Sequence, residues 1–292
     1  MVVNGWLNFN KPEGVTSAHL LNRLKRCFPK GTKLGHAGTL DKFACGVLPV
    51  AVGNATKTIP LIMNAQKTYT FTIQWGVQTD TLDREGDIVA RSSIIPSEQE
   101  VRDLLPMFLG ALQQIPPTFS ALKMNGKRAS DRARSGEVVD LVAREIHIFD
   151  FQLLQHHNTT STFQVTCSKG TYVRALARDL AHALNTTGYV DYLRRDRVGQ
   201  FFLDRTILLE NDLQIDHNAK TKVASAVIPI RTVLDDIPAV SCTELAIARI
   251  SKGQRTPVNL PDMDVVFAID DTDVIATGYV NDRFFLSEKC IY

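Results

Sequence analysis

The stretch Lys33-Leu34-Gly35-His36-Ala37-Gly38-Thr39-Leu40-Asp41 places one acidic residue at the end of a glycine-containing segment. Glycines at this spacing are typical of turns, and an aspartate beside them most often closes a turn or caps a helix. An ionised carboxylate in a pocket can instead act as a nucleophile or as a general base. The rest of the chain decides between these interpretations.

Helices and strands alternate on both sides of this stretch. A strand is predicted over Lys67 to Val77, where large apolar and polar residues alternate with a period of two. Helices are predicted over Thr16 to Phe28 and over Thr171 to Leu184, because apolar residues recur there at helical spacing. The serine and glutamate of Ser97-Glu98-Gln99-Glu100 form a capping box that begins another helix. The chain therefore combines both kinds of element.

The composition is that of an ordinary globular protein, with 292 residues, 44% hydrophobic and 22% charged, which suffices for one large domain and a small one. The formal charge is only +2, so any polyanion site must come from local clustering. Five cysteines without a C-x-x-C pair argue against a disulfide framework and a zinc site. We expect a cytoplasmic location, because the sequence shows no signal peptide and no apolar stretch long enough to span a bilayer.

Two regions differ in character from the remainder. Residues 113–140 contain adjacent prolines and few large apolar residues, which predicts an excursion from the fold. Its cations stand against Asp131 and Glu137, and they are Lys123, Lys127, Arg128, Arg132 and Arg134. Such a run is either a contact surface for a polyanion or solvated surface. After about residue 236, short strand-like runs separated by turns predict a small β domain.

Further motifs accompany Asp41 in a definite order along the chain. They are Asn10-Lys11-Pro12-Glu13-Gly14-Val15-Thr16-Ser17, Gly53-Asn54-Ala55-Thr56-Lys57, Lys67-Thr68-Tyr69, Thr79-Asp80-Thr81-Leu82-Asp83, Gln114-Ile115-Pro116-Pro117, Ser168-Lys169-Gly170-Thr171-Tyr172-Val173-Arg174 and Leu193-Arg194-Arg195. With the stretch that ends at Asp41, these motifs resemble the TruB family of bacterial tRNA pseudouridine synthases in order and approximate spacing. The resemblance is strong over residues 4–201 and looser beyond them.

The resemblance implies an α+β fold of the pseudouridine synthase type, with a mixed, mainly antiparallel sheet flanked by helices. It implies a catalytic domain over residues 1–236, with the basic excursion at about 113–140, and a small PUA-like β domain over residues 237–292. The implied activity is that of an isomerase, a tRNA pseudouridine(55) synthase, which converts uridine 55 in the T loop. No cofactor and no metal are implied. We expect the T arm of tRNA as partner, no membrane, no obligatory protein partner and a monomer.

Pseudouridine formation breaks the bond from ribose C1′ to N1 of uracil, turns the base and joins C1′ to C5. Asp41 matches the family's catalytic aspartate, which either attacks C1′ or removes the C2′ proton, and both routes stay open. Arg174 matches the arginine that holds this carboxylate ionised, so we expect a salt bridge between them. Tyr69 matches the tyrosine that stacks on the flipped uracil.

Other residues are assigned to the pocket or to RNA contact by the same resemblance. Tyr172 and Leu193 match residues that pack around the base, and ordinary core packing is the alternative for both. His36 matches a histidine close to the flipped nucleotide, and we assign it to RNA contact. The remaining residues expected at the RNA are Lys11, Lys123, Lys127, Arg128, Arg132 and Arg194, and Arg195 and Arg197 extend the patch around Arg194.

Three positions depart from the family's pattern. Lys42 replaces the proline that follows the aspartate, Phe119 replaces a tyrosine and Ser130 replaces an aromatic residue. Losing the proline loosens a turn, and losing the phenol removes one hydrogen-bonding group. Neither loss is expected to touch the core catalytic set, so we expect activity, and any effect should fall on substrate affinity.

Three other functions compete with this interpretation. A non-catalytic tRNA-binding or tRNA-folding module would not need Asp41, Tyr69 and Arg174 intact. A guide-RNA-dependent relative acting inside a protein assembly usually carries basic tails, which this sequence lacks at either end. A glycosidase-like hydrolase needs a second carboxylic acid, which the motifs do not supply.

Overall fold

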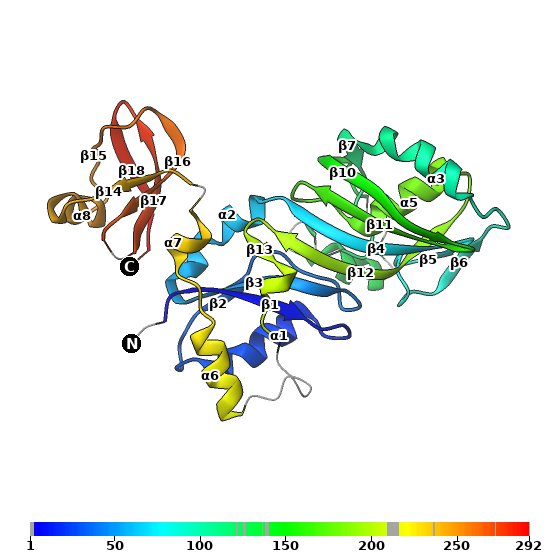
Figure 1. The fold of residues 1–292 in the computed structure, drawn as a ribbon, viewed down its shortest axis with the longest axis horizontal. Helices are drawn as coiled ribbons and strands as arrows, with labels where there is room; N and C mark the ends of the chain where they lie inside the picture. The colour runs from blue at the N-terminus through cyan, green and yellow to red at the C-terminus, as the bar shows by residue number, and fades with distance from the viewer. Residues whose placement is uncertain are drawn as a thin grey trace.

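The computed structural model describes residues 3–120, 122–124, 127–135, 137, 140–208, 216–235, 237–271 and 273–291. Within these residues the chain forms one large mixed sheet with helices packed against it and one smaller sheet near the C-terminus (Figure 1). No helix in the described ranges is both long and apolar enough to cross a membrane.

The large sheet has nine strands, and its main path runs β1-β3-β12-β4-β11-β10-β7, with β2 paired to β3 and β13 paired to β12. Neighbours along this path are antiparallel except for the parallel pair of β3 and β12. The mixed, mainly antiparallel sheet expected from the sequence is therefore confirmed. The strand bounds are β1 Gly5–Lys11, β2 Leu34–His36, β3 Cys45–Val52, β4 Lys67–Trp75, β7 Gly110–Gln114, β10 Arg144–His157, β11 Thr160–Cys167, β12 Gly188–Val198 and β13 Phe201–Phe202.

Strand β4 shows how the sequence alternation becomes a two-sided surface. Phe71, Ile73 and Trp75 are buried in the main core. On the opposite side, Thr72 contacts Thr162 of the neighbouring strand at 2.9 Å between hydroxyl oxygens. The strand ends before Gly76, whose φ of +82° belongs to the left-handed region that glycine favours.

Helices cover both faces of the large sheet. Helices α3 and α5 contribute to the main core, and α1 packs on β1 and β3 together with α6. The three helices expected from the sequence are present, with Thr16 capping α1 and the Ser97–Glu100 capping box beginning α3. Helix bounds are α1 Ser17–Leu24, α2 Ile59–Asn64, α3 Glu98–Leu104, α4 Ala129–Arg134, α5 Val173–Ala183, α6 His217–Ser225, α7 Ile230–Val233 and α8 Glu244–Ser251.

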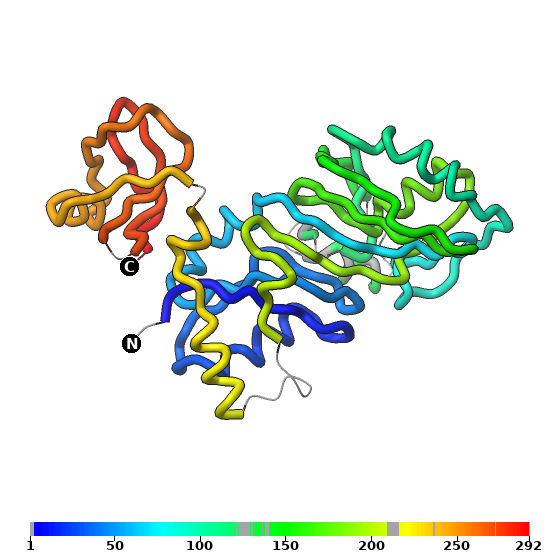
Figure 2. The backbone as a smooth tube through the Cα atoms, in the orientation of Figure 1, coloured from blue at the N-terminus to red at the C-terminus, as the bar shows by residue number. Residues whose placement is uncertain are grey.

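The smaller C-terminal sheet has five strands in the order β14-β16-β17-β18-β15 and a core of its own. Figure 2 shows α7 leading into it, and Phe267 and Ile291 of this region pack with residues of α7 and β1. The β domain expected from the sequence is confirmed. It also contains helix α8, which the sequence pattern does not predict. The boundary between the two domains after residue 236 stays a prediction. The strands of the β domain are β14 Ala239–Ser241, β15 Thr256–Pro257, β16 Met263–Ile269, β17 Val274–Asn281 and β18 Phe284–Cys290, and two short hairpins elsewhere pair β5 Val77–Thr79 with β6 Ile88–Arg91 and β8 Lys123–Met124 with β9 Lys127–Arg128.

The parallel pair of β3 and β12 depends on a glycine. Gly46 lies opposite Arg195 in the register of the two strands and has a φ of +103°. A side chain there would fall far inside contact distance of the main-chain carbonyl oxygen of Arg195. Because backbone cannot move aside as a flexible side chain can, only glycine allows the two strands to approach at this point.

We therefore predict that Gly46→Ala lowers the free energy of unfolding by about 3 kcal/mol or more, since it combines a steric clash with left-handed strain. Gly31→Ala is the matched control, because Gly31 also has a positive φ, of +93°, but open space around it. It should cost about 1 kcal/mol. Urea unfolding of both variants tests this, and equal losses would contradict the clash at Arg195.

Candidate active site

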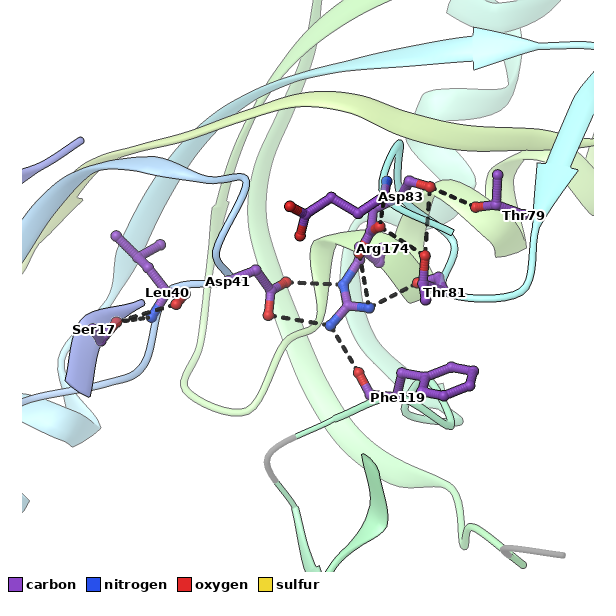
Figure 3. A network of polar contacts seen from close by, with 9 residues as sticks. Ser17, Leu40, Asp41, Thr79, Thr81, Asp83, Phe119 and Arg174 are labelled. Atoms are coloured by element: carbon purple, nitrogen blue, oxygen red, sulfur yellow. Dashed lines mark hydrogen bonds and ion pairs between the residues drawn. The ribbon is translucent and has the colours of Figure 1, made fainter. Parts of the chain in front are cut away.

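Asp41 lies in the loop between β2 and β3, beside the start of α1 (Figure 3). Ser17 fixes this loop at the neighbouring residue: its hydroxyl donates to the Leu40 carbonyl at 3.1 Å and accepts from the Leu40 amide at 3.0 Å. The Leu40 side chain is buried, whereas the Asp41 side chain keeps 38% of its surface exposed. The loop therefore anchors itself through Leu40 and presents the carboxylate to solvent.

Arg174 holds the Asp41 carboxylate from the first turn of α5. Its Nε lies 2.9 Å from Asp41 Oδ2, and its Nη2 donates to Asp41 Oδ1 at 3.2 Å. The salt bridge expected from the sequence is thus confirmed, in the bidentate form that gives the firmest orientation. The arginine side chain is only 5% exposed, so the pair joins a buried cation to a reachable anion.

The same guanidinium has three further partners, which Figure 3 shows converging on it. Nη1 donates to the Thr81 carbonyl at 2.7 Å and lies 3.2 Å from Asp83 Oδ2, while Nη2 donates to the Phe119 carbonyl at 3.0 Å. Arg174 therefore binds two carboxylates and two carbonyls. Because these come from separate segments, the orientation of the guanidinium is fixed independently of Asp41.

Asp83 is a member of this network that sequence reasoning missed. In the sequence it is only the last residue of the Thr79–Asp83 motif, and the linear spacing does not indicate that it meets Arg174. Its carboxylate accepts from the Thr81 hydroxyl at 2.7 Å and from the Glu85 amide at 3.0 Å. Burial raises the pKa of Asp83, although the bond from Thr81 and the charge of Arg174 oppose the shift.

A cavity of about 710 Å³ opens beside the ion pair, and the five residues assigned above to the chemistry or to the base pocket line it. They are Asp41, Tyr69, Tyr172, Arg174 and Leu193. Burial raises the pKa of the Tyr69 phenol, so the hydroxyl keeps its proton at neutral pH. One space thus combines a carboxylate, a cation, an aromatic ring and apolar walls, which suits a flat, partly polar ring.

Lys11 does not lie where RNA can contact it, and its assignment to RNA binding is corrected. The side chain is fully buried, and its ammonium donates to the carbonyls of Pro12, Val15 and Lys42 at 2.9, 2.7 and 3.3 Å. Burial lowers the pKa of Lys11 to about 8. The residue ties the end of β1 to the loop that follows Asp41.

The arginines of β12 separate into exposed and buried groups. Arg194 stays partly exposed and pairs with Asp196 at 2.6 Å, so its RNA contact stays a prediction. Arg195 is 1% exposed, and its inclusion in a surface patch is therefore wrong. His36 lies on β2 outside the residues that line the cavity. Burial, followed by the charge of Arg195, lowers the pKa of His36, which makes the ring neutral at pH 7.

The basic excursion is only partly described. Its backbone forms the β8–β9 hairpin and α4, but the side chains of Lys123, Lys127 and Arg128 lie outside the described residues. Arg132 pairs with Glu137 at 2.7 Å. Contact of these four residues with RNA remains a prediction.

Two of the positions that depart from the family's pattern have a structural explanation, and the side chain of Ser130 is not described. Lys42 forms an exposed salt bridge with Glu85 at 2.8 Å, while its carbonyl accepts from the buried Lys11. The main chain at Phe119 contacts the catalytic set, because its carbonyl accepts a hydrogen bond from Arg174 at 3.0 Å. That contact uses the main chain, so it does not require the tyrosine.

Comparison with known proteins identifies the family to which the chain is similar. Residues 25–173 match the family described as "TruB family pseudouridylate synthase (N terminal domain)". The "tRNA pseudouridine synthase B" of Caulobacter vibrioides is 45% identical over 260 residues, covering 89% of this chain and 83% of that protein. The protein of the same name from Rickettsia conorii is 44% identical over 258 residues, covering 88% and 74%.

Solved structures show the same fold at much lower identity. A chain of the "Cbf5-Nop10-Gar1 Complex" superposes with a TM-score of 0.73 at 22% identity, covering 99% of this chain and 85% of that one. A chain of the "archaeal box H/ACA sRNP Nop10-Cbf5 complex" gives 0.73 at 20% identity, covering 100% and 87%. The fold and the sequence matches define a pseudouridine synthase, which is an isomerase. Within that class, the chain belongs to the TruB family.

We predict that Arg174→Met lowers the free energy of unfolding by about 3 to 5 kcal/mol, because it leaves the buried Asp83 carboxylate without its cation. Arg178→Met, one turn further along α5, is the control. Arg178 pairs with Asp179 and bonds the Ile115 carbonyl, but it is 18% exposed. Its loss should cost about 1 kcal/mol. Chemical unfolding measures both, and similar losses would show that the network around Arg174 is not a stabilising centre.

Proposed function

We propose that this protein converts uridine 55 in the T loop of tRNA into pseudouridine. The observation that carries the proposal is the bidentate pair of Asp41 and Arg174 at the edge of a cavity that Tyr69 also lines. The choice of tRNA follows from the relatives named tRNA pseudouridine synthase B. We also propose that the protein acts in the cytoplasm as a monomer without an obligatory protein partner.

The proposed chemistry begins with a uridine flipped out of the T loop into the cavity. Tyr69 stacks on the uracil, and Tyr172 and Leu193 pack around it, which offsets the few kcal/mol that unstacking costs. Asp41 then acts at the ribose, by attack on C1′ or by removal of the C2′ proton. Arg174 favours the ionised form of this carboxylate and fixes its direction.

Asp83 is proposed as a residue that orients Arg174. With Nη1 held by Asp83 and Thr81, the Nε and Nη2 edge of the guanidinium is left facing Asp41. The cation is therefore in place before substrate arrives, and no reorganisation is needed during the reaction.

Release of tritium from C5 of uridine in an unmodified tRNA transcript tests the proposal. The wild type should release one tritium per tRNA, and Asp41→Asn should reduce the rate by more than about 1,000-fold, because the amide can neither attack nor accept a proton. tRNA binding, measured by filter retention, should persist in the variant. Asp80→Asn is the control, since Asp80 is an exposed carboxylate of the same region.

Two outcomes would contradict parts of the proposal. A wild type that binds tRNA without releasing tritium would be a binding or folding module. Equal rates for wild type and Asp41→Asn would remove Asp41 from the mechanism. An isolated T-arm stem-loop should be converted as well, and its failure would show that recognition extends beyond the T arm.

Asp83→Asn should lower the single-turnover rate by on the order of 10- to 100-fold, since Nη1 of Arg174 loses a charged partner while the shape of the side chain is kept. Asp80→Asn again serves as control and should leave the rate near that of the wild type. An unchanged rate in Asp83→Asn would show that Thr81 and Phe119 alone suffice to orient Arg174.

A further inference from the structure

Arg195 occupies a central position in the large sheet. It lies on β12 directly opposite Tyr69 of β4 on one side and opposite Gly46 of β3 on the other. The register of β12 against β4 shifts just after it, between Arg195 and Arg197. Such irregularities re-aim side chains and are frequent beside functional sites. Here the guanidinium is turned inward, at 1% exposure, and it lines the same cavity as Asp41.

Among the residues that the structure describes, the guanidinium of Arg195 is bound by carbonyls and by no carboxylate. Nε donates to the Val47 carbonyl at 2.8 Å, and Nη2 donates to the Gly38 carbonyl at 3.0 Å. Gly38 belongs to the turn that carries Asp41, so these bonds also fix that turn. Across the described part of the chain, no acidic group lies within ion-pair distance of Arg195. Arg174, by contrast, has two carboxylate partners.

A second buried cation lines this cavity. Lys67 is 6% exposed, and its ammonium donates to the carbonyls of Met63 and Ala65 at 2.5 and 2.6 Å. Burial, and after it the charge of Arg195, lowers the pKa of Lys67 to about 8, so it remains mostly charged at pH 7. Burying positive charge without a counter-ion is costly. Two such groups at one cavity indicate that an anion occupies it during function.

The proposed reaction supplies an anion of the right kind. When the bond from C1′ to N1 breaks, both electrons stay with the uracil ring, which becomes an anion delocalised over N1, O2 and O4. This holds whether Asp41 attacks C1′ or removes the C2′ proton. Joining C5 to C1′ uses an electron pair of the ring, after which the C5 proton leaves and N1 gains a proton. The ring is therefore negative only between the two bond changes.

We propose that Arg195, assisted by Lys67, stabilises the detached uracil anion by holding uncompensated positive charge against the base cavity. The inference rests on the proposed function, and it adds an electrostatic role on the side of the base to the role of Asp41 at the sugar. Fixed charge in a water-poor site acts most strongly where charge develops during the reaction.

The surroundings of Tyr69 support this position for the charge. Burial raises the pKa of its phenol, and the charge of Arg195 is the largest influence that lowers it. Arg195 thus acts at the ring that is assigned to stack on the uracil. A base stacked there lies within reach of the same field.

Substrates that differ only in the stability of the detached base test the proposal. Fluorine at C5 withdraws electron density, so 5-fluorouracil leaves as a more stable anion and needs less help from the protein. T-arm stem-loops with uridine or 5-fluorouridine at the target are compared under single-turnover conditions, by the loss of the target nucleoside from digests. The variants are Arg195→Gln, which removes the charge, and Arg195→Lys, which keeps it.

Arg195→Gln should lower the uridine rate on the order of 100-fold but the 5-fluorouridine rate only on the order of 10-fold, so the ratio of the two rates changes about tenfold in favour of the fluorinated substrate. Arg195→Lys should lower both rates by the same factor and leave the ratio within about twofold of the wild type. A purely structural role predicts an unchanged ratio in both variants, and that result would overturn the proposal.

If Arg195→Gln does not fold, Lys67→Gln provides the test in its place. It should move the ratio in the same direction by a smaller factor, and an unchanged ratio would again overturn the proposal. A wild type that converts neither substrate removes the proposed function and this inference together. A wild type that converts both, with unchanged ratios in folded variants, removes the role of Arg195 alone.

Discussion

One guanidinium organises the site. Arg174 binds Asp41 and Asp83 through its charge and Thr81 and Phe119 through main-chain carbonyls, all at 2.7 to 3.2 Å. Burying a cation with fewer partners would lower the stability of the fold. A cation with partners on one side only would be free to rotate. Because Arg174 is held from the side away from Asp41, the carboxylate meets a donor pair whose direction is already set.

The two buried arginines near the cavity, Arg174 and Arg195, have different electrostatic roles. Arg174 is neutralised by acidic groups and serves orientation, whereas Arg195 has no carboxylate partner among the described residues and keeps its field available to the cavity. Both are placed by the sheet and by the helix packed against it: Arg174 from the start of α5, Arg195 from a register shift in β12. The carboxylate of Asp41 lies on a loop that Ser17 and Arg195 bind through the main chain of Leu40 and Gly38.

Sequence reasoning reached the class of fold, the family and the Asp41–Arg174 pair, because motif order and strand alternation carry that information. It failed where a residue's role depends on what surrounds it in space. Lys11 and Arg195 look like surface cations in the sequence, yet the first closes the end of β1 and the second lies in the sheet interior. The role of Asp83 was missed for the same reason, because nothing in its local sequence shows that a helix 90 residues later delivers Arg174 to it.

The carbonyl contacts of Arg174 determine which sequence changes the site tolerates. Thr81 and Phe119 contribute oxygen atoms that every residue type possesses, so exchanges of side chain at these positions leave the contact with Arg174 untouched. What the arginine constrains is the path of the main chain. Lengthening or shortening either segment by one residue would displace the oxygen, whereas the replacement of tyrosine by phenylalanine at position 119 does not. The percentage identity between two aligned sequences therefore understates how much the site depends on the segments that contain Thr81 and Phe119. The lengths of these two segments reflect that dependence better.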